Sequence, residues 1–280
     1  MLKLNGKVIE ITKFPNSEVL IKDKDNLNIG VNTNLIEFKF ESNMDFLDLM
    51  FIKKHIDEKC PSSKKVLSIP YLPYSRMDRT EGEAVFTLKY ICEFINMLKF
   101  DKVITLEAHS NVSLALLDRL ENINYSVNLA KKCMEDINFN KEKDYIVFPD
   151  EGARKRYKKD FSDCKILTCE KQRDFTTGKI SQLKINEPLV EQNFKAIIVD
   201  DLCSYGNTFI MASNTLKELG AEEIYLCVTH SEDGLFLGDI FKTSFIDTVY
   251  TTNSLFNLDK IKAKLEITTF LNGIKVCNLF

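Results

Sequence analysis

The chain has 280 residues, and its 38 Lys and Arg against 41 Asp and Glu give a formal charge of −3. A length of roughly two domains, with 44% hydrophobic residues, excludes a disordered or collagen-like chain. The slightly negative charge argues against a nucleic acid as the main partner, because binding to a duplex requires a basic surface.

The first half of the chain alternates helical patterns with short β-rich runs. Apolar residues at three- and four-residue spacing predict helices with one buried face at residues 46–51 and again at 86–100. Between and after these stretches, the runs 66–71 and 102–106 are typical of strands. This order favours parallel strands that are covered by helices.

The second half repeats the alternation. We expect strands at 145–148, 165–168, 196–199 and 223–228, and helices at about 151–162 and 207–219. Gly220 is a good C-cap for the last helix. The pattern predicts an α/β fold of two halves, each a mainly parallel sheet flanked by helices. The polar stretch 135–144 is the candidate boundary, which gives domains 1–140 and 141–280.

Cysteine usage and hydropathy indicate the compartment. The eight cysteines contain no Cys-x-x-Cys pair, and three histidines are too few for a zinc cluster. The spread of the cysteines along the chain is typical of small buried side chains in a reducing compartment. No apolar run reaches the ~18 residues of a membrane helix, and the start lacks the apolar core of a signal peptide. We therefore expect a cytoplasmic protein with no membrane partner.

The most informative stretch is Ala196-Ile-Ile-Val-Asp-Asp-Leu-Cys-Ser-Tyr-Gly-Asn-Thr208. An apolar strand ends in two carboxylates, and a short loop with Gly206 and Thr208 then opens a helix. In an open α/β sheet, ligands bind beyond the carboxyl ends of the strands, and the first turn of a helix offers N–H groups to a phosphate. Asp200 and Asp201 are therefore expected to face a sugar or a hydrated Mg²⁺, and the loop to hold a phosphate. The alternative is an ordinary strand that ends in an Asp N-cap.

That stretch resembles the ribose-phosphate loop of the type I phosphoribosyltransferase fold. Further motifs resemble one branch of it, the ribose-phosphate diphosphokinases or PRPP synthetases, from about residue 14 to His230. They are Phe14-Pro-Asn-Ser-Glu18, Pro70-Tyr-Leu-Pro-Tyr-Ser-Arg-Met-Asp-Arg79, Leu106-Glu-Ala-His109, Phe148-Pro-Asp-Glu-Gly152 and Glu170-Lys-Gln-Arg173. Each motif is weak alone, but together with the loop they stand in the order of that family. The resemblance implies two similar phosphoribosyltransferase-like domains.

The resemblance also implies a reaction, the transfer of the β,γ-diphosphoryl group of ATP to the C1 hydroxyl of a 5-phosphorylated ribose, with release of AMP. Positive charge is required because the transition state is highly anionic. By resemblance, His109 and Asp150 hold Mg²⁺ with ATP, and Lys171 and Arg173 are catalytic, with Glu170-Lys-Gln-Arg173 opening a mobile loop. The implied ATP-binding residues are Phe14, Asn16, Glu18, Arg76, Met77, Asp78, Arg79 and His109. The implied acceptor-binding residues are Asp200, Asp201, Ser204, Tyr205, Gly206, Asn207 and Thr208.

The adenine loop at Phe14 reaches a neighbouring subunit's ATP site in the family, so the resemblance implies a homo-oligomer, a dimer or a hexamer.

The acceptor loop departs from the family, which has Asp-Thr-Gly-Gly-Thr where this chain has Ser204-Tyr-Gly-Asn-Thr208. The acceptor is then ribose 5-phosphate with altered contacts, or ADP-ribose, whose 5′-phosphate is not terminal. ADP-ribose is slightly favoured, because with this acceptor the chain resembles a largely phage-encoded branch that diphosphorylates ADP-ribose as the first step in rebuilding NAD⁺. A phage-encoded chain would work in the host cytoplasm.

Plainer interpretations stay open for these residues. For His109 the alternative is a structural histidine, and for Lys171 and Arg173 it is a solvated charged turn. For Arg76, Asp78 and Arg79 it is a set of surface ion pairs without a binding role. The basic stretch 154–159 is expected to be a solvated helix face. Two other functions remain, a phosphoribosyltransferase and a non-catalytic regulatory homologue. The first has no use for the Phe14 loop, and the second need not retain Lys171.

Overall fold

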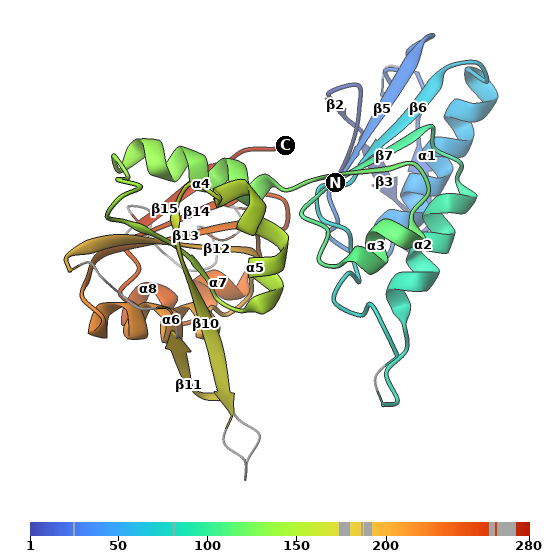
Figure 1. The fold of residues 1–280 in the computed structure, drawn as a ribbon. Coiled ribbons are helices and arrows are strands. Elements are labelled where there is room, and N and C mark those ends of the chain that lie inside the picture. The colour runs from blue at the N-terminus through green and yellow to red at the C-terminus, as the bar shows by residue number, and fades with distance from the viewer. Residues whose placement is uncertain are drawn as a thin grey trace. The chain divides into compact units, whose positions relative to one another are not determined.

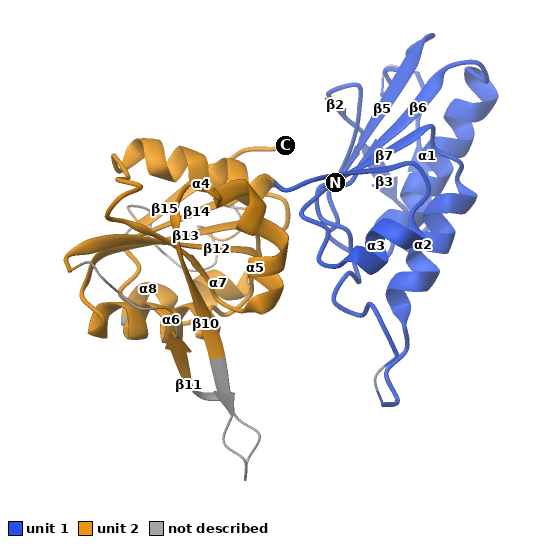
Figure 2. Ribbon diagram, in the orientation of Figure 1, with its two compact units in different colours: residues 1–124 blue, residues 125–280 orange. Residues whose placement is uncertain are grey.

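The computed structural model describes residues 1–24, 26–80, 82–173, 180–185, 187, 192–257, 261 and 273–280. It divides into two compact units, residues 1–124 and 125–280 (Figure 2). Within the described ranges, no helix is long and apolar enough to cross a membrane.

Unit 1 is built on a six-stranded sheet in the order β2-β1-β5-β6-β7-β8 (Figure 1). Its strands are β1 (Leu2–Leu4), β2 (Lys7–Val8), β5 (Thr33–Phe38), β6 (Lys64–Ser68), β7 (Lys102–Leu106) and β8 (Leu120–Ile123). The strands from β5 to β8 are parallel, and β1 pairs antiparallel with β2 and β5. A separate hairpin pairs β3 (Ile11–Lys13) with β4 (Val19–Ile21). The helices are α1 (Asp45–Lys59), α2 (Thr87–Met97) and α3 (Asn111–Leu116).

The helix predicted at 46–51 is part of α1, but its buried face is only partly the expected one, because Phe46 is buried whereas Leu47 and Phe51 are 37% and 41% exposed. In α1, Leu49, Ile52 and Ile56 recur at three- and four-residue spacing and are at most 1% exposed. They pack with apolar residues of the sheet and of α2 in one cluster. The strand expected at 66–71 ends at Ser68, because Pro70 has no N–H to continue the ladder.

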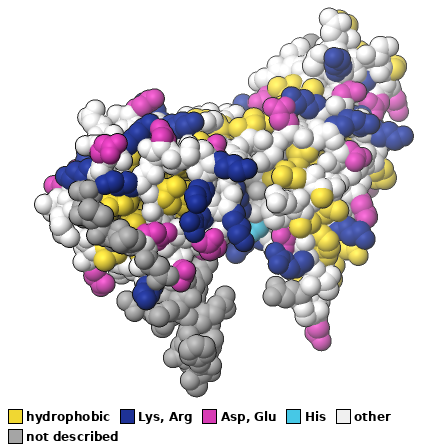
Figure 3. All heavy atoms as spheres, in the orientation of Figure 1, with side chains coloured by type: hydrophobic (Ala, Val, Ile, Leu, Met, Phe, Trp, Pro, Cys, Tyr) yellow, Lys and Arg dark blue, Asp and Glu magenta, His cyan; other side chains and the backbone are white. Residues whose placement is uncertain are grey.

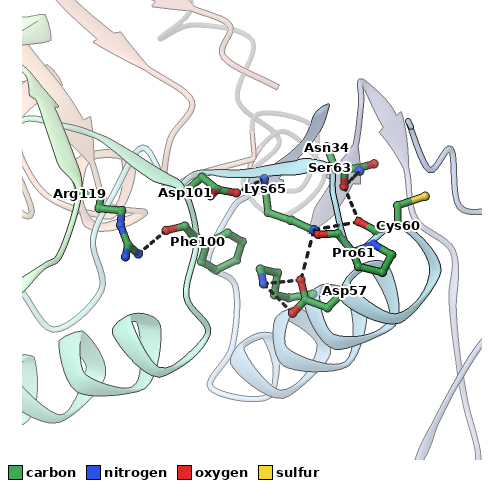
Figure 4. Close-up of polar contacts among 10 residues, drawn as sticks. Asn34, Asp57, Cys60, Pro61, Ser63, Lys65, Phe100, Asp101 and Arg119 are labelled. Atoms are coloured by element: carbon green, nitrogen blue, oxygen red, sulfur yellow. Dashed lines mark hydrogen bonds and ion pairs between the residues drawn. The ribbon is translucent and has the colours of Figure 1, made fainter. Parts of the chain in front are cut away.

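The C-terminal end of α1 is fastened by a buried lysine. Lys65 Nζ donates hydrogen bonds to the carbonyls of Cys60, 2.9 Å away, and Pro61, 2.8 Å away (Figure 4). Lys53 of α1 is 2% exposed, and its Nζ lies 2.7 Å from both carboxylate oxygens of Asp57. Lys65 Nζ also lies 3.8 Å from that carboxylate. The Asp57 carboxylate thus balances the charges of two lysines that are both almost fully buried.

Unit 2 is built on a seven-stranded sheet in the order β11-β10-β9-β12-β13-β14-β15. Its strands are β9 (Tyr145–Phe148), β10 (Lys165–Arg173), β11 (Ile180–Ile185), β12 (Phe194–Cys203), β13 (Ala221–Ser231), β14 (Thr248–Thr252) and β15 (Ile274–Cys277). All of its neighbouring strands pair in parallel except β10 with β11. The helices are α4 (Tyr125–Asp136), α5 (Glu151–Tyr157) with the 3-10 turn Lys158–Phe161, α6 (Asn207–Glu218), α7 (Gly234–Leu237) and α8 (Ile240–Thr243).

Both faces of this sheet are buried, which explains its unbroken apolar strands. In β9, Tyr145 and Val147 join one core cluster with residues of α6 and α8, whereas Ile146 and Phe148 join a second with residues of α4 and α5. A strand that is covered on both sides alternates between two cores and needs no polar positions. The α/β fold of parallel sheets flanked by helices is therefore confirmed.

The chain divides into the two units between residues 124 and 125, earlier than the boundary expected at 140. Helix α4 belongs to unit 2, because Val127, Ala130 and Cys133 are buried in the cluster that includes residues of β12 and β13. The polar stretch that suggested a boundary instead ends α4 and connects it to β9.

Candidate active site

In unit 1, two loops at the carboxyl ends of β6 and β7 bring predicted site residues together. Asp78, from the loop after β6, is 6% exposed and accepts a hydrogen bond of 2.8 Å from Nε of Arg79. The loop after β7 carries His109 and Ser110. The pKa of the Asp78 carboxyl is lowered chiefly by the hydrogen bond from Arg79, and further by the nearby charges of Arg79 and His109. Asp78, Arg79 and His109 therefore form one cluster.

The cluster points part of its charge outward. Arg76 and Met77 are exposed, and the Arg79 side chain is 72% exposed although its Nε is bonded to Asp78. At the end of β7, Glu107 adopts a φ of 52°, and the following Ala108 N–H donates to Asn122 Oδ1 at 2.7 Å. This turn fixes the direction in which the chain presents His109.

The predicted adenine loop is the tip of the β3–β4 hairpin. The Phe14 N–H donates to the carbonyl of Glu18 at 2.8 Å, and the Ser17 N–H donates to the carbonyl of Phe14 at 2.9 Å. Asn16 Oδ1 accepts from the Glu18 N–H at 3.2 Å, which closes the turn. Phe14 is 47% exposed, a high value for an aromatic ring of this size. The tip thus presents an aromatic face to whatever lies beside it.

In unit 2, three carboxylates gather at the carboxyl ends of β9 and β12. Asp150 follows β9 and caps α5, its Oδ1 accepting from the Ala153 N–H at 3.0 Å. Asp200 and Asp201 lie within β12, not beyond its end as the sequence suggested, since the ladder with β13 continues to Cys203. Loss of water around the Asp200 carboxyl raises its pKa well above the ordinary value, and the charges of Asp201 and Asp150 add to this. A cation or hydroxyl donors bound there would offset the cost of placing these carboxyl groups close together.

The acceptor loop 204–208 connects β12 to α6. Gly206 is the N-cap of α6 with a φ of 83°, and no side chain caps that end of the helix. The first N–H groups of α6 therefore have no side-chain cap, and such groups at a helix start bind a phosphate well. Tyr205 is 56% exposed at the same loop. A Cβ on Gly238 would lie 2.7 Å from the carbonyl oxygen of Tyr205, so the turn between α7 and α8 packs directly against the loop.

The predicted catalytic pair lies in a strand. Lys171 pairs with Leu183 and Arg173 with Ile180 across β10 and β11, so these residues extend the sheet, and the loop predicted to open after them falls outside the described residues. The side chains of Lys171 and Arg173 lie outside the described part of the structure, as do residues 174–179. The strand position disagrees with the plainer interpretation of a solvated turn.

The described residues contain no group of three or more His, Cys, Asp or Glu side chains arranged to hold a metal ion. Magnesium in nucleotide enzymes is held by one or two carboxylates together with substrate phosphates and water. Asp150, beside the acidic pair of β12, fits that donor set. His109, the other predicted ligand, belongs to unit 1.

The sequence of this chain is similar to those of several known proteins. No protein-family model matches the chain. The ribose-phosphate pyrophosphokinase of Sulfurisphaera tokodaii is 30% identical over 218 residues, which cover 75% of this chain and 72% of that protein. The chain belongs to the ribose-phosphate pyrophosphokinase family. The family member of Pyrococcus furiosus is 28% identical over 256 residues, 88% of this chain and 86% of its own length. The predicted diphosphotransferase is thereby confirmed.

A solved structure agrees on the fold. The phosphoribosylpyrophosphate synthetase of Mycobacterium smegmatis superimposes with a TM-score of 0.72 at 16% identity, covering 98% of this chain and 86% of that one. At this identity the similarity shows the fold alone. It confirms two phosphoribosyltransferase-like domains.

The sequence analysis missed Arg156, which it placed on a solvated helix face. Lys and Arg side chains do gather over α5 (Figure 3), and Lys155, Lys158 and Lys159 are exposed. Arg156, however, turns inward to Asp201, with its Nη1 3.2 Å from Oδ2. The available signal was its position three residues after Ala153, on the side of α5 that is buried.

Proposed function

We propose that the chain transfers the β,γ-diphosphoryl group of ATP to the C1 hydroxyl of a ribose whose 5-position is phosphorylated, and releases AMP. Membership of the family supports the reaction class, since its members are named for pyrophosphoryl transfer to ribose phosphate. The observation that carries the acceptor side is the acidic pair of β12 directly before the uncapped N-terminus of α6.

Unit 1 supplies the residues for ATP. Arg76 and Arg79 present guanidinium groups to the triphosphate, and Asp78 orients Arg79 through its hydrogen bond of 2.8 Å. Phe14 offers its exposed ring for stacking on adenine, with Asn16 and Glu18 in the same turn for the polar edge of the base. The tip of the hairpin is a short exposed turn, and we propose that it completes the ATP site of a second subunit in a homo-oligomer.

Unit 2 supplies the residues for the acceptor. The carboxylates of Asp200 and Asp201 accept hydrogen bonds from the ribose hydroxyls, and the N–H groups of residues 206–208 bind the 5-phosphate. Lys171 and Arg173 neutralise charge on the transferred group and on the departing AMP. Asp150 is the residue of unit 2 that would hold Mg²⁺ with the ATP phosphates, and His109 of unit 1 is a candidate ligand by the family resemblance alone. The ion, when bound, supplies charge neutralisation of the diphosphoryl group.

We propose ADP-ribose as the preferred acceptor. Tyr205 is 56% exposed and Leu237 57% exposed, and the backbone contact of Gly238 with Tyr205 brings their segments together. An aromatic and an aliphatic side chain beside a phosphate loop suit a ligand that continues past its phosphate into a second nucleoside. The replacement of a glycine by Asn207 also leaves less room for the backbone to wrap a terminal phosphate.

Ribose 5-phosphate is the alternative acceptor. It is favoured by the names of the relatives, which are ribose-phosphate pyrophosphokinases over most of their length. Both acceptors present the same ribose diol to the acidic pair, so the two possibilities differ only beyond the 5′-phosphate.

Phosphorus NMR of the purified chain with Mg–ATP and each acceptor tests the proposal. We expect AMP and a new anomeric diphosphate with ADP-ribose, at a higher rate than with ribose 5-phosphate. Turnover of ribose 5-phosphate but not of ADP-ribose would contradict the proposed acceptor and leave the reaction class intact. A Tyr205→Thr variant is the matched control, and we expect its preference to move toward ribose 5-phosphate. Absence of AMP with both acceptors would contradict the function itself.

A further inference from the structure

Arg156 of α5 and Asp201 of β12 form a largely buried ion pair at the proposed acceptor site. The Arg156 side chain is 21% exposed and the Asp201 side chain 8% exposed, and Nη1 lies 3.2 Å from Oδ2. The guanidinium is also held from its own helix, because Nη1 lies 3.2 Å from the hydroxyl oxygen of Tyr157 and the guanidinium carbon lies 5.5 Å from the centre of that ring. Tyr157 is itself fully buried, so Arg156 has a fixed support.

Asp201 needs a nearby cation to stay in place. It is 5% exposed and stands next to Asp200 in a strand, with Asp150 at the neighbouring strand end. Adjacent carboxylates that are withdrawn from water repel each other, and one of them turns away or binds a proton unless a positive group compensates. A carboxylate that must accept hydrogen bonds from sugar hydroxyls has to be ionised and correctly turned.

The backbone leaves Asp200 and Asp201 with different supports. The Asp200 carboxylate accepts the N–H of Asp201 at 2.9 Å, and its carbonyl accepts the hydroxyl of Ser126 at 2.6 Å. Asp201 has an ion pair with Arg156 of α5, from a separate part of the sequence. The two carboxyl groups therefore differ in their supports: the backbone holds Asp200, and Arg156 places a full positive charge 3.2 Å from Asp201.

We propose that Arg156 is a positioning residue of the acceptor site, which holds the Asp201 carboxylate ionised and turned toward the ribose hydroxyls of the acceptor. This inference rests on the proposed acceptor role of Asp201. Arg156 itself need not touch the substrate. Its removal is expected to weaken acceptor binding and to spare ATP binding, because the proposed ATP-binding side chains of Arg76, Arg79 and Phe14 belong to unit 1.

The test is the steady-state kinetics of Arg156→Met, with Arg154→Met as the matched control. Arg154 lies on the same helix and pairs with Glu151 of that helix at 2.9 Å. We expect the acceptor KM of Arg156→Met to rise about 10- to 100-fold, the scale of a lost hydrogen bond to a charged group. The KM for ATP should stay within about twofold of wild type, and Arg154→Met should leave both KM values unchanged.

Two further variants keep the test independent of folding. Arg156→Lys retains the charge and should recover most of the acceptor KM, and Arg156→Met should add nothing in an Asp201→Asn background, since both act through one carboxylate. Additive effects in that background, equal rises in both KM values, or a variant that behaves like Arg154→Met would overturn the inference. If wild-type enzyme releases no AMP, the proposed function fails instead.

Discussion

The substitution Gly206→Ala tests how the acceptor loop is held. Gly206 has a φ of 83°, where an L side chain costs about 1–2 kcal/mol. A Cβ there would also lie 2.8 Å from Cδ1, 3.2 Å from Cβ and 3.3 Å from Cγ1 of Ile240. Overpacking of this kind costs about 1–3 kcal/mol, so the total expected loss of unfolding free energy is about 2–5 kcal/mol.

Gly220 at the other end of α6 provides the control. Its φ is 96°, but a Cβ there would meet the end of the exposed Gln192 side chain, with Oε1 at 2.7 Å. That side chain swings away at little cost, so Gly220→Ala should lose only the conformational part, about 1–2 kcal/mol. Replacing Ile240 by Val removes Cδ1, the nearest atom, and should reduce the cost of Gly206→Ala by about 1 kcal/mol.

Urea-induced unfolding of the full chain, followed by circular dichroism, measures all of these variants, and AMP release measures the loop's function. We expect Gly206→Ala to lose activity with either acceptor, because α8 would push the loop from its position. The reasoning is refuted if Gly206→Ala is no less stable than Gly220→Ala, or if Ile240→Val leaves its cost unchanged.

Three other predictions follow from described contacts and from the family resemblance. Asp57→Ala leaves Lys53 buried without its carboxylate and should cost about 1–3 kcal/mol in urea unfolding, reduced because the Asp57 side chain is 35% exposed. Lys53→Met in the same background should restore most of that loss, and a double variant as unstable as Asp57→Ala would contradict the ion-pair explanation. In native protein at pH 8, a thiol reagent should label at most Cys60, Cys164 and Cys277, because the other five cysteines are buried, and burial raises the pKa of Cys92 and Cys169 to about 12. Rapid labelling of all eight without unfolding would show that these cores open. Lys171→Ala should lower kcat by orders of magnitude while calorimetry detects nearly normal ATP binding, and an unchanged kcat would exclude the catalytic role.

The central strands were predictable because a strand buried on both faces appears in the sequence as an unbroken run of apolar residues. The apolar run at 145–148 matches β9, and residues 102–106 match β7. Helix α4 was not predicted, although Val127, Ala130 and Cys133 recur at three-residue spacing on its buried face. The charged residues of the stretch 135–144 instead suggested a boundary there, whereas they end α4 and lead into β9.

The site divides along a similar line. Asp200, Asp201 and Gly206 were predictable because a strand, an acidic pair and a helix start are contiguous in sequence. The partner of Arg156 was not predictable, since the spacing from Ala153 places Arg156 on the buried side of α5 but does not say which acidic residue it meets there. That pairing arises only when β12 and α5 pack together, which brings residues from distant parts of the sequence within 3.2 Å.

The ladder of β12 with β13 reaches the last residue before the acceptor loop. Cys203 pairs with Ser231, and its carbonyl accepts the N–H of Glu232 at 2.9 Å. Residues 204–206 therefore connect a finished strand to the start of α6 at Asn207, and the position of Gly206 is constrained by the core, through Ile240. Grafting Asp-Thr-Gly-Gly-Thr at positions 204–208 is a small redesign problem, in which Gly206 already has the backbone that the graft requires. A family with one chemistry gains new substrates most cheaply at such a junction.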